Sequence, residues 1–204
     1  MDLLDNPKAE TGVLLKRVVV PTVAVLCVSR NSVYKSLENV VCYDAECDVR
    51  TFAGGMPIVA HPPCRSWSAF CAHQAKPFPG EKALGPVCVS WLQECGGVLE
   101  HPAHSKLFDA CQLPMPGETR DGMWTIEVLQ SLWGHEGTAK KTWLCFCGIE
   151  RRQIRLPLTL RSPGGDKRLW QTMPRKLRSA TCQAMAEWLV DVARCSRHNA
   201  KLTP

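Results

Sequence analysis

The sequence predicts an α/β protein in which a mostly parallel β-sheet has helices on both faces. Short apolar runs rich in β-branched residues alternate along the chain with segments whose apolar residues recur at helical spacing. This alternation is typical of parallel sheets, whose strands are buried on both sides and joined by helices. A hydrophobic content of 45% and a charged content of 22% over 204 residues suit one folded domain.

Three strands are expected in the first third of the chain. Residues 1–17 are polar and mixed, which predicts a flexible lead-in. The apolar runs predict strands at Val23–Val28, Val40–Tyr43 and Pro57–Ala60. A short helix is expected over Ser32–Leu37. The third strand leads into His61-Pro62-Pro63-Cys64, where the prolines prevent a strand or helix from continuing.

Helix and strand alternate again in the middle of the chain. A helix ended by Gly96-Gly97 is predicted by apolar residues at Leu84, Val87, Cys88, Trp91, Leu92 and Cys95. A fourth strand, Val98–Glu100, stops at His101-Pro102, and Thr142–Cys147 predicts a fifth. A second amphipathic helix is expected between them, with apolar positions Trp124, Val128, Leu129 and Leu132.

The last third of the chain carries a concentration of arginine and lysine, in a chain whose net charge is +6. Residues 151–178 are rich in Pro, Gly and Arg and predict a basic loop region. A helix over residues 179–197 should complete the domain that begins at residue 18, with an apolar face of Cys182, Met185, Ala186, Leu189 and Val192 or Ala193. The basic residues form either a solvated face or a surface that contacts nucleic-acid phosphates.

The twelve cysteines are expected to be mostly free thiols in a reducing compartment. The start of the chain lacks the pattern of a secretory signal, and no apolar run is long enough to cross a membrane. We therefore expect a cytoplasmic protein with no membrane partner. No Cys-x2-Cys pair is present, so no bound metal is expected.

Cys64 is the strongest candidate for a chemical role. It follows a strand and two prolines, which would hold it rigidly, and His61 and Arg65 could supply the positive charge that activates a thiol. The alternative is one more core cysteine, although a Pro-Pro turn is an unusual place for one. In parallel sheets, ligands bind beyond the carboxyl ends of the strands, where Asp44 and Glu100 also fall.

A cysteine and a glutamate can act together on a pyrimidine. The thiolate adds to C6 while the acid, if it holds a proton near pH 7, stabilises the charge that develops at N3. C5 then becomes nucleophilic and can accept a one-carbon unit. A desolvated site would favour the protonated form of Glu100 that this role needs.

Several segments, in order, resemble the DNA cytosine-5 methyltransferases, in particular small phage-encoded members. His61-Pro62-Pro63-Cys64-Arg65-Ser66-Trp67-Ser68 resembles their Pro-Cys catalytic loop, and Leu99-Glu100-His101-Pro102 their Glu-Asn-Val strand. Trp133-Gly134-His135 followed by Lys140-Lys141-Thr142-Trp143-Leu144 is similar to a Phe-Gly-His…Lys-x-Thr-x-Leu-Trp segment, and Arg178-Ser179-Ala180-Thr181 begins a segment like their closing helix. The resemblance spans roughly residues 23–195.

The resemblance implies a Rossmann-like fold of the methyltransferase type over residues 18–150, with S-adenosylmethionine as cofactor and DNA as substrate. Cys64 would be the nucleophile and Glu100 the N3 acid, while Arg65 and Arg155 would contact the base or phosphates. The expected cofactor residues are Ser29, Arg30, Asn31, Asp44 and Pro62. For Asp44, a turn-capping role is the alternative. Trp67 and Trp170 are candidates for base stacking.

Two departures keep other functions open. The first strand runs into Cys27-Val28-Ser29-Arg30-Asn31, without the glycines of the family's cofactor loop. Only residues 150–178 could serve as a target-recognition region, so a protein partner could supply specificity. The alternatives are pyrimidine methyl or hydroxymethyl transfer on a nucleotide with another cofactor, and a non-catalytic nucleic-acid-binding or anti-defence protein of the same fold.

Overall fold

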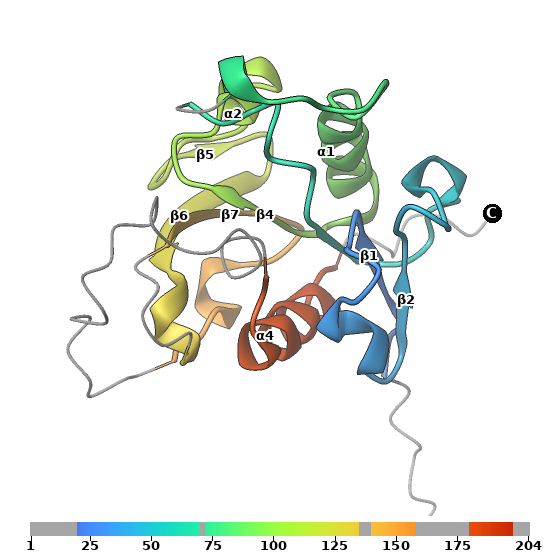
Figure 1. The fold of residues 1–204 in the computed structure, drawn as a ribbon. Helices are drawn as coiled ribbons and strands as arrows, with labels where there is room; N and C mark the ends of the chain where they lie inside the picture. Colours follow the sequence, from blue (N-terminus) through green and yellow to red (C-terminus); the bar gives the residue numbers. More distant parts are fainter. Residues whose placement is uncertain (1–19, 70–71, 135–139, 158–179, 198–204) are drawn as a thin grey trace, which may run out of the picture.

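A computed structural model describes residues 20–69, 72–134, 140–157 and 180–197 and confirms the α/β class. Its centre is a seven-stranded mixed sheet with the strand order β2-β1-β3-β4-β7-β6-β5 (Figure 1). The strands are β1 (Val23–Leu26), β2 (Val40–Cys42), β3 (Ile58–Ala60), β4 (Gly97–Pro102), β5 (Thr119–Arg120), β6 (Met123–Leu129) and β7 (Lys141–Cys147). The α-helices are α1 (Leu84–Cys95), α2 (Lys106–Ala110) and α4 (Gln183–Arg194). The 3₁₀ turns are η1 (Val33–Ser36), η2 (Val49–Thr51), η3 (Ala72–Gln74), η4 (Gln130–Trp133) and η5 (Arg151–Gln153).

The first half of the sheet is parallel. β1 lies between β2 and β3, and β3 pairs in turn with β4. The register aligns Val25, Val59 and Val98 in one buried row across three strands. Their carboxyl ends therefore meet at one edge of the sheet, as the sequence predicted.

The second half of the sheet is antiparallel, so the expectation of a mostly parallel sheet is corrected to a mixed one. β7 lies between β4 and β6 and runs antiparallel to both. The helix expected around Trp124–Leu132 is wrong, because residues 123–129 form β6 and only residues 130–133 form a 3₁₀ turn. Thr125, Ile126 and Val128 favour a strand, and seven residue pairs with β7 satisfy its backbone.

β4 is longer than expected, because His101 and Pro102 do not stop it. The strand continues to Pro102 by pairing with β7, which places Pro102 opposite Thr142. β3 has already ended at Ala60, opposite Leu99. Glu100 and His101 thus extend beyond β3 while β7 still supports them on the other side.

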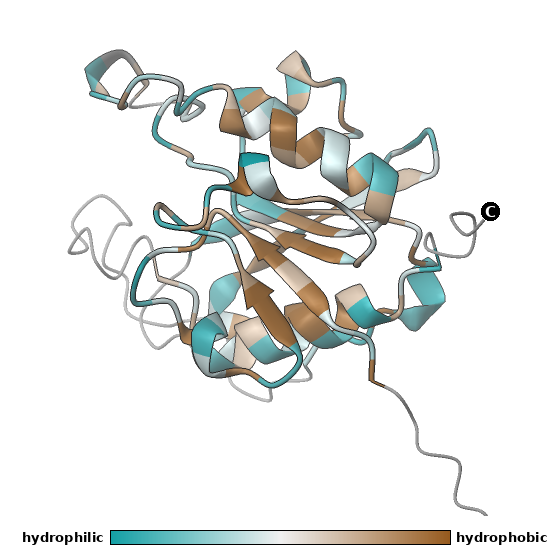
Figure 2. Ribbon diagram, turned by 90° about the vertical axis from the view of Figure 1, so that its right-hand side faces the viewer, coloured by the Kyte–Doolittle hydropathy of each residue, from teal (hydrophilic) through white to brown (hydrophobic). Residues whose placement is uncertain are grey.

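Alternate residues along the strands belong to two different apolar clusters. Val59, Val98 and Leu144 belong to the cluster that includes Met185 and Leu189 of α4. Ile58, Leu99 and Cys145 belong to the cluster that includes Cys88 and Leu92 of α1. Figure 2 shows apolar residues where α1 and α4 meet the sheet. The predicted apolar faces of these two helices are confirmed at Leu84, Cys88, Leu92, Cys95, Met185, Ala186, Leu189, Val192 and Ala193.

Some of the remaining sequence predictions concern residues that the structure does not describe. Residues 1–17 and most of the basic loop, including Trp170, lie outside the described residues. α2 and β5 were not expected from the sequence. Among the helices of the described ranges, none combines the length and apolarity needed to cross a bilayer.

Candidate functional site

The register of β3 and β4 brings His61 beside Glu100. Ala60 pairs with Leu99, so the next residue on each strand lies at the same level. The His61 backbone N–H still donates to Leu26 O at 3.0 Å, which holds this residue in line with the strand. His61 Nδ1 lies 3.1 Å from Glu100 Oε2. Cys64 follows three residues later, in the loop that leaves the same sheet edge.

Glu100 is a buried carboxylate surrounded by hydrogen-bond donors. Its Oε1 accepts from Thr142 Oγ1 at 3.0 Å and from Gln130 Nε2 at 3.1 Å. The Lys140 ammonium lies 3.6 Å from the same oxygen, and His61 faces the other oxygen. The Glu100 residue is only 6% exposed. β4, β7 and η4 thus jointly enclose this group.

These contacts overturn the expectation that Glu100 holds a proton. Burial alone raises the pKa of a carboxyl group, and burial is the largest single influence on Glu100. The charge of Lys140 and the hydrogen bond and charge of His61 together outweigh it and hold the Glu100 pKa well below its usual range. Glu100 is therefore ionised in the resting site, contrary to the expectation that a desolvated site would favour its protonated form.

Tyr34 fixes the other side of His61. Its hydroxyl lies 2.9 Å from His61 Nε2, and the two rings are 5.3 Å apart. Burial first, and the nearby Glu100 charge second, raise the Tyr34 pKa well above its usual value, so the hydroxyl keeps its proton. An ionised Glu100 requires a proton on Nδ1, so His61 donates to Glu100 from this nitrogen while its Nε2 faces the Tyr34 hydroxyl.

Cys64 lies at the surface of the loop beside this network. Its carbonyl accepts from the Trp67 backbone N–H at 3.0 Å, which closes a turn over residues 64–67. The residue is exposed, yet desolvation of its sulphur raises the thiol pKa. The Lys140 charge lowers that pKa, the Glu100 charge raises it, and Arg65 lowers it to a smaller extent. Cys64 is therefore a resting thiol whose pKa depends on the opposing charges of Lys140 and Glu100.

Arg65 is used to anchor the loop. Its Nε lies 2.8 Å from Oε1 of Glu81, a fully buried carboxylate. Glu81 Oε2 also accepts from the Phe78 backbone N–H at 3.2 Å. The expected contact of Arg65 with base or phosphate would have to use the part of the guanidinium that Glu81 does not occupy.

Trp67 packs inward, contrary to the prediction of a stacking platform. The residue is 7% exposed. Its ring lies so close to Gly85 of α1 that a Cβ there would be 2.7 Å from the indole Nε1. The Lys82 ammonium lies 5.0 Å from the ring centroid. Trp67 therefore holds the Cys64 loop against α1.

Asp44, the expected partner of the cofactor's ribose diol, is already engaged by its own turn and by Lys35. Asp44 Oδ1 accepts from the backbone N–H groups of Glu46 and Cys47, and Oδ2 binds Lys35. With its side chain only 5% exposed, Asp44 caps its own turn and is not free for a ribose diol. Lys35 is the main reason that the Asp44 pKa lies well below its usual range.

The other cofactor candidates lie in the segments that follow β1 and β3. Ser29, Arg30 and Asn31 are exposed after β1, Arg30 pairs with Glu46, and Pro62 is buried after β3. The chain turns away from β1 through Cys27, whose φ of 61° is a conformation that favours glycine. The turn is therefore made without the glycines of the family's loop, and Cys27 Sγ lies 3.5 Å from Cys88 Sγ of α1.

Arg155 is exposed in the segment that follows η5. Its carbonyl accepts from Trp188 Nε1 of α4 at 2.8 Å. Within the described part of the chain, no contact joins Arg155 to Cys64 or Glu100. The expected role of its side chain at the base stays a prediction.

Four members of the site were missed as functional residues in the sequence. They are Tyr34, Gln130, Lys140 and Thr142. Lys140 and Thr142 lie within a segment that carries the family resemblance, which was the available signal for them. Tyr34 and Gln130 gave no local signal, because they meet the site only through η1 and η4.

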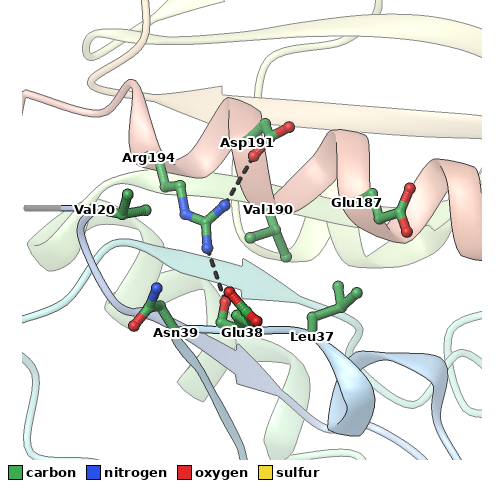
Figure 3. Close-up of a pocket in the computed structure, with 8 residues that line it drawn as sticks. All are labelled: Val20, Leu37, Glu38, Asn39, Glu187, Val190, Asp191 and Arg194. Atoms are coloured by element: carbon green, nitrogen blue, oxygen red, sulfur yellow. Dashed lines mark hydrogen bonds and ion pairs between the residues drawn. The ribbon is translucent and has the colours of Figure 1, made fainter. Parts of the chain in front are cut away.

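A separate pocket of about 350 Å³ lies between α4 and the segment after η1 (Figure 3). Arg194 crosses it, donating to Asp191 Oδ1 and to the carbonyl of Glu38. None of the predicted site residues lines it. Among the described residues, no group of three or more His, Cys, Asp or Glu side chains is placed to hold a metal ion.

Comparison with known proteins found no relative of this chain. No protein-family model matches the chain, and no curated protein or solved structure is significantly similar to it.

Proposed function

We propose that this chain is an enzyme that modifies C5 of cytosine in DNA through a covalent adduct between Cys64 and C6 of the base. The proposal includes a Rossmann-like fold of the methyltransferase type, which would place the site at the carboxyl ends of the parallel strands. The single observation that carries it is that Glu100, paired with Lys140, lies within β4 beside His61, the residue from which the Cys64 loop leaves β3.

The ionised state of Glu100 changes how the acid would act. An ionised carboxylate first accepts a proton, and the resting Cys64 thiol has one to give. Sulphur then bonds to C6, the ring electrons shift toward N3, and Glu100 passes the proton to N3. The proton lost by the thiol is thus the proton gained by the base, and C5 is left as an enamine carbon.

His61, Thr142 and Gln130 would hold the Glu100 carboxylate in one orientation during this transfer. Each donates to Glu100 or faces it from a separate element. Donors that are already in place need not reorganise as charge moves from sulphur to the ring. Positioning of the substrate would depend on these contacts as well as on the protein surface that binds DNA.

The one-carbon donor is the part of the function that the resemblance alone supports. S-adenosylmethionine would supply an electrophilic methyl group, but Asp44, which caps its own turn, is not free to bind a ribose diol. This observation favours a second candidate, the transfer of a methyl or hydroxymethyl group to a pyrimidine nucleotide from another cofactor. Both candidates use the same attack by Cys64.

Exchange of the C5 hydrogen tests the attack without any donor. An activated C5 takes a deuteron from D2O and then loses its original proton, so each turnover raises the mass of a cytosine by one deuterium. We expect exchange with wild type and none with Cys64→Ser. Cys195→Ser is the matched control, because Cys195 is also exposed but lies after α4.

The substrates in this experiment separate the candidates. Exchange in single- or double-stranded DNA supports the first, whereas exchange confined to free cytidine nucleotides supports the second. Absence of exchange on every substrate, or equal exchange with Cys64→Ser, would contradict both. Calorimetric titration with S-adenosylmethionine then tests the donor directly.

A further inference from the structure

Glu100 and the Lys140 ammonium group pair at the centre of the site, beside the loop that carries Cys64. Lys140 Nζ lies 3.6 Å from Glu100 Oε1, and both side chains are nearly buried, at 11% and 8% exposure. The same ammonium is the strongest charge acting on Cys64, ahead of the adjacent Arg65. Because charges interact strongly where water is scarce, Lys140 is positioned to stabilise a negative charge on either Glu100 or Cys64.

Other charged groups do not replace Lys140 in this role. Arg65, in the Cys64 loop, is paired with Glu81. His101, on β4 beside Glu100, is fully buried, and burial lowers its pKa to about 4, so it is neutral near pH 7. His61, at the end of β3, is already bound between Glu100 and Tyr34.

We propose that Cys64 and Glu100 share one negative charge under the control of Lys140. In the resting site the charge is on Glu100, and Cys64 stays a thiol. When the Cys64 proton passes to Glu100 as the base binds, Glu100 becomes neutral and Lys140 then stabilises the Cys64 thiolate. Lys140 is therefore a positioning residue that couples formation of the nucleophile to occupancy of the site.

This coupling protects an exposed thiol. Thiolates, and not thiols, react with oxidants and alkylating agents, so an empty site would be unreactive. The catalytic use of the coupling rests on the function proposed above. The charge coupling itself can be measured without a substrate, which allows the two proposals to fail separately.

Alkylation of Cys64 by iodoacetamide, followed by peptide mass spectrometry across about pH 6 to 10, measures the thiolate directly. We expect Glu100→Gln to increase the alkylation rate of Cys64 near pH 7 by about tenfold, because it removes the competing negative charge. Lys140→Met should lower the rate. The loss caused by Lys140→Met should be larger in the Glu100→Gln background than in wild type, since Lys140 then acts on Cys64 alone.

Lys141→Met is the matched control. Lys141 is the next residue, is exposed, and pairs with Glu127 at 2.8 Å, so its removal should leave Cys64 alkylation unchanged. Cys195 provides an exposed reference thiol in the same digest, and protection of the buried Cys88 reports folding. If Cys88 becomes reactive in Lys140→Met, that variant is unfolded, and Lys140→Arg and Glu100→Gln are compared instead. Lys140→Arg keeps the positive charge and should retain the wild-type dependence of the alkylation rate on pH.

The result that would overturn this inference is an equal effect of Lys140 replacement in both backgrounds, or a rate that Glu100→Gln leaves unchanged or lowers. If the alkylation rates follow the expected pattern but no C5 exchange occurs on any pyrimidine, the coupling stands and the proposed function fails. If C5 exchange occurs but Lys140→Met changes the alkylation rate by the same factor in the wild-type and Glu100→Gln backgrounds, the proposed function stands and the coupling fails.

Discussion

His61 Nδ1 and Glu100 Oε2 lie 3.1 Å apart, across the boundary between β3 and β4. The contact joins the residue after the last residue of a short strand to an interior residue of a longer one. It exists because Ala60 pairs with Leu99, so one further residue on each strand brings the imidazole level with the carboxylate. The two strands thereby connect the Cys64 loop to the charge at Glu100.

Replacing Tyr34 with Phe should destabilise the protein by about 1–2 kcal/mol. The change removes the hydroxyl that faces His61 Nε2 and leaves a ring nitrogen without its partner in a buried setting. Urea unfolding would measure the loss. Tyr43→Phe is the control, because Tyr43 is only half-buried, and an equal loss in the two variants would contradict the role assigned to the Tyr34 hydroxyl.

Thr142→Val should cost roughly 1.5–3 kcal/mol at pH 7, since it removes a donor to a buried ionised carboxylate. Thr142→Ser keeps the hydroxyl and should lose much less. The Glu100 pKa is lowered in the folded protein, so stabilisation that depends on its charge is present above its unfolded pKa and is lost on acidification. The free energy of unfolding of wild type should therefore fall as the pH drops below about 4.5, and it should fall less steeply for Glu100→Gln, which has no carboxyl group to titrate at this position. An equal fall in the two proteins would show that Glu100 is not ionised in the folded state.

His101 should make the protein less stable on mild acidification. Burial lowers its folded-state pKa to about 4 from an ordinary 6.5, so the unfolded chain binds a proton first as the pH falls. The free energy of unfolding should drop by up to about 3 kcal/mol between these values. His101→Phe should flatten this part of the pH profile, whereas replacing the exposed His104 should not. An unchanged profile in His101→Phe would refute the assignment.

Gly97→Ala should be severely destabilising, by at least about 3 kcal/mol. Gly97 has a φ of 126°, and a Cβ there would lie 2.0 Å from the backbone O of Ile58. β3 and β4, which pair through Ile58 and Gly97, would have to separate. Gly117→Ala is the control, because Gly117 also has a positive φ but has no atom within 4 Å of the added Cβ. Thermal unfolding of the two variants separates the clash from backbone strain alone, which costs about 1–2 kcal/mol.

Local patterns in the sequence were sufficient for the elements that carry the Cys64 loop. The strands that became β1, β2, β3 and β7 lie where apolar runs predicted them, and α1 begins near Pro86, a position that proline tolerates. β6 was missed because Trp124, Val128 and Leu129 also fit a helical spacing. Pairing with β7 decided in favour of a strand, and pairing depends on a partner that a local pattern does not contain.

The position of Glu100 on a strand near Cys64 was determined by the sequence itself, since short-range periodicity and prolines define where strands run. Its charge was decided only by the tertiary structure. Gln130, Lys140 and Thr142 are 30 or more residues away in sequence, yet they converge on one carboxylate through the antiparallel half of the sheet. Burial alone would have protonated Glu100, and the donors that this fold brings to it keep it ionised.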